Sequence, residues 1–265
     1  MCGRYTIVTK LESIEKRFNV KTAQPELLIP NTNVSPGDKA PVITNQHPDI
    51  LQFFHFGLTP FWAKKRMYFF NARAEGDHNK ENNPQYSGAK GIVNKPSFRK
   101  AIRSQRCLIP ADCFIEGPEK EKLSKPYVVY LRNGQRPFSF AGIWDIWTDK
   151  ETGEIVQGFS IITTVSNKVT QKIGHHRSPV ILHPDHEQTW LNSNADLGEI
   201  TELLRPYDAR QMNAYPIDPM IKNPRVNGLE LLNPIGERLF PEQEFNLTQY
   251  LKLEGMGMTR ARQRP

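Results

Sequence analysis

The stretch from residue 126 to 164 constrains the fold most, because three β-favouring runs follow one another there with no helical pattern between them. The runs at 127–131 and 159–164 are rich in aromatic and β-branched residues, and the run at 138–147 is long and aromatic. Strands that do not alternate with helices argue against a doubly wound parallel sheet. We therefore expect an α+β fold, with a mixed, largely antiparallel, barrel-like β core and peripheral helices.

The rest of the chain supplies shorter elements. Further strands are expected at 4–8, 42–44, 51–56, 67–70 and 107–109, and helices at 9–18, 97–104, 185–191 and 197–204. Thr9 followed by Glu12 is a capping-box signature for the first helix. The stretch 25–41, rich in proline and asparagine, is expected to be a loop. We expect a single catalytic domain over residues 2–235 and a C-terminal extension over 236–265 that ends in a partly flexible tail.

Composition excludes several classes of protein. Hydrophobic residues make up 38% of the 265, too many for a disordered chain. No run approaches the roughly 20 apolar residues of a spanning helix, and the first ten residues lack the apolar core of a signal peptide. We expect a monomer that neither enters a membrane nor is secreted. It would be cytoplasmic and nucleoid-associated in a bacterium, or nuclear in a eukaryote.

Positive charge is concentrated in one fifth of the chain. The whole sequence has a formal charge of +7, whereas residues 61–110 hold eleven Lys or Arg against three Asp or Glu, a local charge of +8. A basic stretch of this kind is either a solvated face or a surface for a polyanion such as a nucleic acid.

Cys2 carries the most distinctive chemistry. The three cysteines, Cys2, Cys107 and Cys113, form no CxxC pair, so neither a disulfide framework nor a zinc ribbon is indicated. Removal of Met1 would leave an N-terminal aminothiol, whose α-amine has an ordinary pKa of about 7.7–8.0 and is partly nucleophilic at neutral pH. The amine can condense with an aldehyde to an imine, and the thiol can then close a five-membered thiazolidine. A cysteine at position 2 by accident is the plainer alternative.

Six segments extend this interpretation across the chain. They are MCGRY at 1–5, NVSPG at 33–37, GLTPFW at 57–62, NARAE at 71–75, IPAD at 109–112 with the glutamate at 116, and HHRSPV at 175–180. In order and spacing they resemble the SRAP family, the SOS-response-associated peptidase-like proteins that process abasic sites, over residues 2–235. The chain departs from the usual family pattern at Ala63, Gly117 and His176.

The resemblance implies a single-domain protein that traps the ring-opened aldehyde of an abasic site in single-stranded DNA as a thiazolidine crosslink. It implies that Cys2 is the nucleophile, that Asn71 orients the amine and the sugar, that Glu116 is the acid/base, and that His175 helps to open the sugar ring. No cofactor or metal is implied. The residues expected to contact DNA are Arg4, Asn33, Pro36, Phe61, Trp62, Arg73 and Arg177.

General chemistry supports several of these roles. A buried carboxyl with a raised pKa suits proton transfer at Glu116, and a histidine that titrates near neutrality suits His175. Arginines engage phosphate oxygens bidentately, and exposed rings stack on unpaired bases. Each residue also has a structural alternative, and we expect at least one of Phe61 and Trp62 to belong to the core.

Two other functions remain open at this level. Class II glutamine amidotransferases also mature to a chain that begins Cys-Gly, so the protein could be an N-terminal-nucleophile amidohydrolase, or a peptidase limited to its own Met1. A non-catalytic module that binds single-stranded DNA would not need Cys2. Partners that recruit the protein to replication forks are compatible with the main hypothesis, which predicts lyase-like crosslinking activity.

Overall fold

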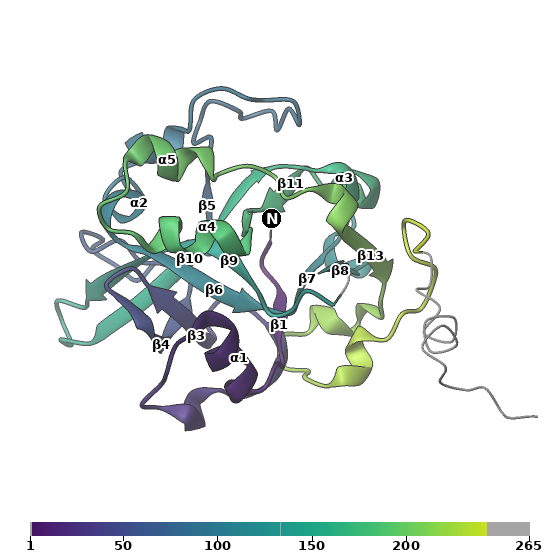
Figure 1. Ribbon diagram of the computed structural model, residues 1–265, viewed down its shortest axis with the longest axis horizontal. Helices are drawn as coiled ribbons and strands as arrows, with labels where there is room; N and C mark the ends of the chain where they lie inside the picture. Colours follow the sequence, from purple (N-terminus) through teal and green to yellow (C-terminus); the bar gives the residue numbers. More distant parts are fainter. Residues whose placement is uncertain (1, 133, 243–265) are drawn as a thin grey trace, which may run out of the picture.

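Two sheets form the body of the protein in the computed structural model, which describes residues 2–132 and 134–242 (Figure 1). The larger sheet consists of β3 (Lys39–Thr44), β4 (His47–Phe56), β5 (Asn71–Arg73), β6 (Arg106–Ala111), β9 (Phe138–Thr148), β10 (Ile155–Val165), β11 (Arg177–Pro179) and β12 (Ile181–Leu182). The order β10-β4-β3-β6-β9 returns to β10 and closes a small barrel. Only β4 and β5 pair with β10 in parallel, and the other ladders are antiparallel, which confirms the expected fold class.

The smaller sheet places the N-terminal segment inside the fold. Its strands, in spatial order, are β13 (Met212–Pro216), β8 (Tyr127–Leu131), β7 (Cys113–Glu116), β1 (Tyr5–Ile7) and β2 (Asn31–Val34). The prediction of a loop throughout 25–41 is wrong for β2, because pairing with β1 satisfies the backbone of Asn31–Val34. This pairing joins segments about 26 residues apart, which local turn chemistry does not reveal.

Helices lie around the strands (Figure 1). They are α1 (Leu11–Phe18), α2 (Ala101–Ser104), α3 (Lys168–Ile173), α4 (Pro184–Leu191) and α5 (Leu197–Glu202). Single 3-10 turns occur at Pro25–Leu27, Gly91–Asn94, Lys122–Ser124, Ala209–Gln211, Pro219–Lys222 and Leu229–Leu232. The predicted capping box is absent, since the N-cap of α1 is Lys10 with no side-chain bond. The Thr9 hydroxyl instead hydrogen-bonds the carboxylate of Asp112, which also accepts from the backbone N–H of Val8 and Thr9.

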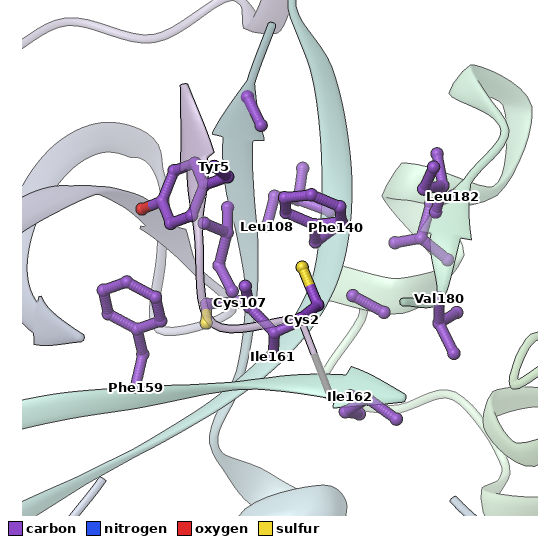
Figure 2. Close-up of a cluster of buried hydrophobic side chains, with 14 of the residues drawn as sticks. Cys2, Tyr5, Cys107, Leu108, Phe140, Phe159, Ile161, Ile162, Val180 and Leu182 are labelled. Atoms are coloured by element: carbon purple, nitrogen blue, oxygen red, sulfur yellow. The ribbon is translucent and has the colours of Figure 1, made fainter. Parts of the chain in front are cut away.

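Aromatic side chains fill the space between the barrel and β1. The rings of Phe56 and Phe159 stack with centroids 5.2 Å apart, and Tyr5 meets both Phe56 and Phe140 edge-on. Figure 2 shows Cys2 in the same cluster, with its sulfur turned toward Phe140. The N-terminal segment is thus anchored by burial of its own side chains in the core.

The remaining expectations concern loops and the C-terminus. The predicted strand at 67–70 is wrong, because only an isolated bridge joins Phe69 to Leu58 and the strand begins at Asn71. Of the predicted extension, residues 236–242 lie along β13, where the N–H of Leu239 bonds the carbonyl of Ala214 at 2.8 Å. The predicted tail lies outside the described residues. None of the helices in the described ranges is long and apolar enough to cross a membrane.

Candidate active site

Cys2 immediately precedes β1 and is buried, with 1% of its surface exposed. Its thiol lies among apolar side chains from the barrel, including Phe140 and Ile161 (Figure 2). This burial raises the pKa of the Cys2 thiol well above its ordinary value. The sulfur is therefore a neutral thiol at pH 7, and an adjacent base must take its proton before it acts as a nucleophile.

Asn71 holds the backbone of Cys2. Parallel pairing of β5 with β10 fixes Asn71 opposite Ile161, and its side-chain Nδ2 donates to the Cys2 carbonyl at 2.9 Å and to the Phe70 carbonyl at 3.0 Å. Its Oδ1 is buried and accepts no hydrogen bond from the described residues. Because a buried amide oxygen without a donor is costly, Oδ1 is an acceptor available to an N–H or O–H that enters the site.

Glu116 is brought to Cys2 by strand pairing. β7 runs antiparallel to β1 with Phe114 opposite Tyr5, and the N–H of Ile115 bonds the carbonyl of Arg4 at 2.9 Å, so Glu116 lies toward the Cys2 end of this segment. The side chain is buried, and desolvation raises the pKa of its carboxyl. The environment therefore shifts the carboxyl toward its protonated form, and the acid/base role of Glu116 stays a prediction.

His175, in the segment that follows α3, lies next to Glu116. Gly174 ends α3 in the left-handed conformation, with φ 87°, and the chain turns so that the imidazole is buried. Its Nδ1 lies 3.0 Å from the carbonyl of Arg177 and 3.3 Å from the N–H of the same residue. A carbonyl can only accept, so the shorter contact places the proton on Nδ1 and leaves the lone pair on Nε2.

This tautomer pairs the two buried groups. His175 Nε2 is 3.4 Å from Glu116 Oε1. A carboxyl whose pKa is raised tends to hold its proton, and the lone pair on Nε2 can accept a hydrogen bond from it. Burial lowers the pKa of His175 to about 4. The expectation that His175 titrates near neutrality is therefore wrong, and the imidazole is neutral at pH 7.

A cavity of about 330 Å³ opens beside these groups. Gly3, Glu116 and His175 line it together with Arg4 and Pro36. The cavity wall also includes Phe70, Ile115, Gly117, Pro118, Glu119, Lys122, Leu123 and His176. Four predicted site residues, from β1, the β2–β3 turn, β7 and the segment after α3, thus share one cavity.

Two residues predicted to contact DNA are instead structural. The prediction for Asn33 is wrong, because its side chain is 1% exposed and its Nδ2 donates to the carbonyls of Ile221, Asn223 and Val226. Its Oδ1 accepts from Arg4 Nη1 at 2.9 Å, so Asn33 positions Arg4 at the cavity wall.

Arg177 is likewise buried, with 1% exposed, and the prediction of a DNA contact there is wrong. Its Nη2 lies 2.7 Å from Oε2 of the fully buried Glu75. A buried charge is stable only when it is paired, so this ion pair explains why Arg177 and Glu75 can both be buried. The ion pair connects the segment after β5, the strand that carries Asn71, to β11, the strand that follows His175.

The other predicted DNA-binding residues lie on an exposed loop, 60–68, and on β5. Phe61 and Trp62 are 52% and 49% exposed, so the expectation that one of them belongs to the core is wrong. The N–H of Phe61 bonds the buried carboxylate of Asp145, and Lys100 Nζ lies 4.2 Å from the centre of the Phe61 ring. Arg73 is half-buried, with Nη1 bonded to the carbonyl of Asn79.

A larger hollow, of about 710 Å³, lies between α1 and α4. Among its lining side chains, Arg17 makes two bonds of 2.9 Å to Glu187, which also accepts from Ser139. His183 and His186 are near each other, but no group of three metal-ligating side chains occurs in the described part of the chain. The cavity beside Cys2, by contrast, brings Glu116 and His175 together.

Comparison with known proteins identifies the relationship. The sequence model of the family described as SOS response associated peptidase (SRAP) matches residues 1–224. The chain belongs to the SRAP family. The abasic site processing protein YoqW of Bacillus subtilis is 35% identical over 239 residues, covering 88% of this chain and 99% of the relative. The abasic site processing protein HMCES of Xenopus tropicalis is 26% identical over 280 residues, with coverages of 89% and 78%.

The fold of this SRAP protein is also shared. A crystal structure of a protein from Bacteroides thetaiotaomicron superposes with a TM-score of 0.74 and 31% identity, covering 88% of this chain and 99% of that one. Sequence reasoning missed one residue near the site, because Glu75 stands in the NARAE segment without an assigned role and pairs with Arg177. The alanine before this glutamate, directly after the short strand β5, was the available signal for burial and pairing. Tyr68, 49% exposed, belongs to the aromatic surface of loop 60–68.

Proposed function

We propose that this SRAP protein binds abasic sites in single-stranded DNA and forms a thiazolidine crosslink through Cys2 once Met1 is removed. The observation that carries the proposal is the hydrogen bond of Asn71 to the Cys2 carbonyl, next to a cavity that Gly3, Glu116 and His175 line. The names of the relatives, abasic site processing proteins, support the same substrate.

The reaction begins at the α-amine of Cys2. The amine nitrogen attacks the aldehyde carbon of the ring-opened sugar, and the resulting carbinolamine loses its hydroxyl as water to give an imine. The Cys2 sulfur then adds to the imine carbon while its proton moves to a base, and the nitrogen takes up a proton to become the secondary amine of the ring. Each crosslink releases one water, and no oxidant or reductant is consumed.

We assign these proton transfers to Glu116. Its protonated carboxyl can donate to the departing hydroxyl, and the resulting carboxylate can accept the thiol proton. A base is needed there because burial keeps the Cys2 thiol protonated at neutral pH. His175 Nε2, 3.4 Å from Glu116 Oε1, accepts from the carboxyl and holds it in position.

The contacts of the Asn71 side chain indicate its role in the reaction. Asn71 Nδ2 holds the Cys2 carbonyl, and its Oδ1 is available to accept from the freed α-amine. An amine that donates to Oδ1 keeps its lone pair directed away from the amide, toward the cavity. Asn71 therefore orients the nucleophile, and the neutral His175 contributes to opening of the sugar through the proton that it shares with Glu116.

DNA reaches the cavity along a basic and aromatic surface. Phe61, Trp62 and Tyr68 are exposed, and Lys64, Lys65 and Lys100 lie beside them in the basic segment. Unpaired bases stack on such rings while the backbone follows the positive charge. Phosphate contacts carry no base readout, so we expect little sequence preference.

A crosslinking assay tests the proposal. Protein with a processed N-terminus is incubated with single-stranded oligonucleotides that do or do not contain an abasic site, and the products are separated on denaturing gels. We expect a shifted band with abasic DNA only, lost in Cys2→Ala and retained in Cys113→Ala, the matched control at another buried cysteine. Absence of the band with wild-type protein would falsify the proposal.

The N-terminus provides a second test. A retained Met1 or a tag converts the α-amine of Cys2 into a peptide nitrogen, so we expect no crosslink from unprocessed protein. Crosslinking by a tagged protein would indicate chemistry at the thiol alone. Binding of abasic DNA without any covalent product, unchanged in Cys2→Ala, would instead indicate the non-catalytic binding module.

The family description, a peptidase, supports hydrolysis of the Met1–Cys2 bond by the protein itself. Mass spectrometry of wild type and Glu116→Gln, both expressed in cells that lack methionine aminopeptidase activity, separates the two routes to the mature chain. We expect loss of Met1 in wild type and its retention in the variant. Retention in both proteins would assign the cleavage to an aminopeptidase.

A further inference from the structure

The segment 117–125 follows Glu116 directly and folds back on it. A Cβ atom at Gly117 would lie 1.8 Å from the carbonyl oxygen of Lys122 and 3.1 Å from that of Lys125, so only glycine allows this close approach. The N–H of Glu119 bonds the carbonyl of Gly174 at 3.0 Å, beside His175. The segment is therefore held between the acid/base residue and the histidine.

Lys122 occupies an unusual backbone conformation in this segment. Its φ is 52°, in the left-handed region that a residue with a Cβ adopts at a cost and glycine adopts freely. The conformation is maintained by the bond of its N–H to the Pro118 carbonyl at 2.7 Å and by the contact with Gly117. Unfavourable backbone conformations of this kind concentrate at functional sites.

The strained lysine also borders the cavity. Lys122 lines it together with Glu116, His175 and Arg4, and its side chain is exposed. Among the other charged groups of the segment, Glu119 lies 3.2 Å from His176 and Lys125 lies 3.4 Å from Glu121, whereas Lys120 does not line the cavity. Within residues 2–132 and 134–242, Lys122 takes part in no ion pair, so its ammonium is available to an anion at the cavity mouth.

We propose that Lys122 binds a DNA phosphate next to the sugar trapped by Cys2, and that its side chain is the reason a lysine is kept at a left-handed position. The inference rests on the proposed function, since the phosphate belongs to the DNA that enters the cavity. Arg4, held by Asn33 and by the Lys222 carbonyl, supplies a second cation at the same cavity. The backbone on either side of the reacting sugar can thus be neutralised at both walls.

The proposal predicts different effects of Lys122 variants on protein stability and on DNA binding. Lys122→Gly removes the charge and relieves the left-handed backbone, so the melting temperature should stay the same or rise. Binding should weaken, and the slope of log K against log salt for single-stranded DNA should become shallower by about 0.7, the value for one lost phosphate contact. Lys122→Asn, which also tolerates this conformation, should behave in the same way, and Lys122→Arg should restore the slope.

The experiment measures fluorescence anisotropy with an intact single strand and crosslinking with an abasic strand, at several salt concentrations. We expect the half-saturating DNA concentration of Lys122→Gly to rise about threefold to tenfold while the maximal crosslinking rate stays at the wild-type value. Lys120→Gly, a charge-matched control that does not line the cavity, should leave the half-saturating concentration unchanged.

A higher melting temperature with unchanged affinity and salt slope in Lys122→Gly would overturn the inference, because the lysine would then be an ordinary loop residue. Failure of the proposed function looks different. If wild type forms no crosslink, weaker and less salt-dependent binding of intact DNA by Lys122→Gly still supports a phosphate contact, and unchanged binding contradicts it.

Discussion

Replacement of Glu75 by glutamine is expected to destabilise the protein strongly. The carboxylate is fully buried, Arg177 is 1% exposed, and Oε2 lies 2.7 Å from Nη2 of the guanidinium. Glu75 Oε1 also accepts from the Thr164 hydroxyl at 2.9 Å and the Val165 N–H at 3.1 Å, and a glutamine oxygen can keep both bonds. The substitution therefore removes the charge and leaves the local shape intact.

The size of the expected destabilisation follows from the Arg177 guanidinium, which stays buried without a counter-charge in the variant. Removing one partner of a buried ion pair costs about 3–5 kcal/mol, because the remaining charge stays out of water. For a chain of this size each kcal/mol lowers the melting temperature by about 2–4 °C, so we expect a decrease of roughly 6–20 °C. Arg177→Met should also destabilise, by leaving Glu75 buried without a counter-charge.

Urea unfolding of wild type, both single variants and the double variant Glu75→Gln/Arg177→Met measures the coupling. The double variant buries no charge, so it should be more stable than either single variant, with a coupling of about 2–3 kcal/mol. If Glu75→Gln changes the free energy of unfolding by less than about 0.5 kcal/mol, the size of a typical surface substitution, the ion pair does not stabilise this region.

Three further perturbations address the site. Glu116→Gln should gain stability relative to wild type as pH rises, because the pKa of this carboxyl is raised on folding; the gain should begin near the ordinary pKa of 4.5 and level off above the folded pKa. Urea unfolding between pH 4 and pH 8 measures it, and a difference that does not vary with pH would contradict the raised pKa. Asn71→Ala removes the bond to the Cys2 carbonyl and should slow crosslinking about tenfold, the equivalent of one hydrogen bond, with little change in DNA affinity; single-turnover kinetics separate the two, and an unchanged rate would make Asn71 dispensable. Trp62→Ala should weaken binding of single-stranded DNA by about 1–3 kcal/mol in anisotropy titrations, whereas Leu229→Ala, at a residue 66% exposed outside the basic segment, should not; equal affinities would remove Trp62 from the DNA surface.

Local patterns predicted the elements that depend on local interactions. The run at 127–131 coincides with β8, and the first helix ends at Phe18 as expected. The expected strand at 159–164 extends to Ile155–Val165 because a hairpin with β9 pairs its additional residues. Hairpins and amphipathic helices carry their own periodicity, so short windows of sequence reveal them.

Elements that depend on distant partners were less predictable. β2 was expected to be loop because proline and asparagine dominate its surroundings, and it is a strand because β1 supplies its hydrogen bonds. Asn33 and Arg177 were expected to contact DNA because of the family resemblance, but Asn33 donates to the carbonyl of the buried Ile221 and Arg177 pairs with the buried Glu75, both far along the chain. Phe61 and Trp62 show the reverse, since aromatic residues are usually buried and these two are exposed, with the backbone N–H of Phe61 bonded to Asp145.

The sequence by itself determined the chemistry available to this protein: a cysteine at position 2 whose α-amine removal of Met1 would free, a basic and aromatic segment, and six segments in SRAP order. Only the tertiary structure decided the state of those groups. Burial keeps the Cys2 thiol neutral, favours the protonated carboxyl of Glu116 and lowers the pKa of His175 to about 4. The physical reason is desolvation, which depends on what surrounds a charge in three dimensions, and that environment is assembled from strands that lie far apart in the sequence.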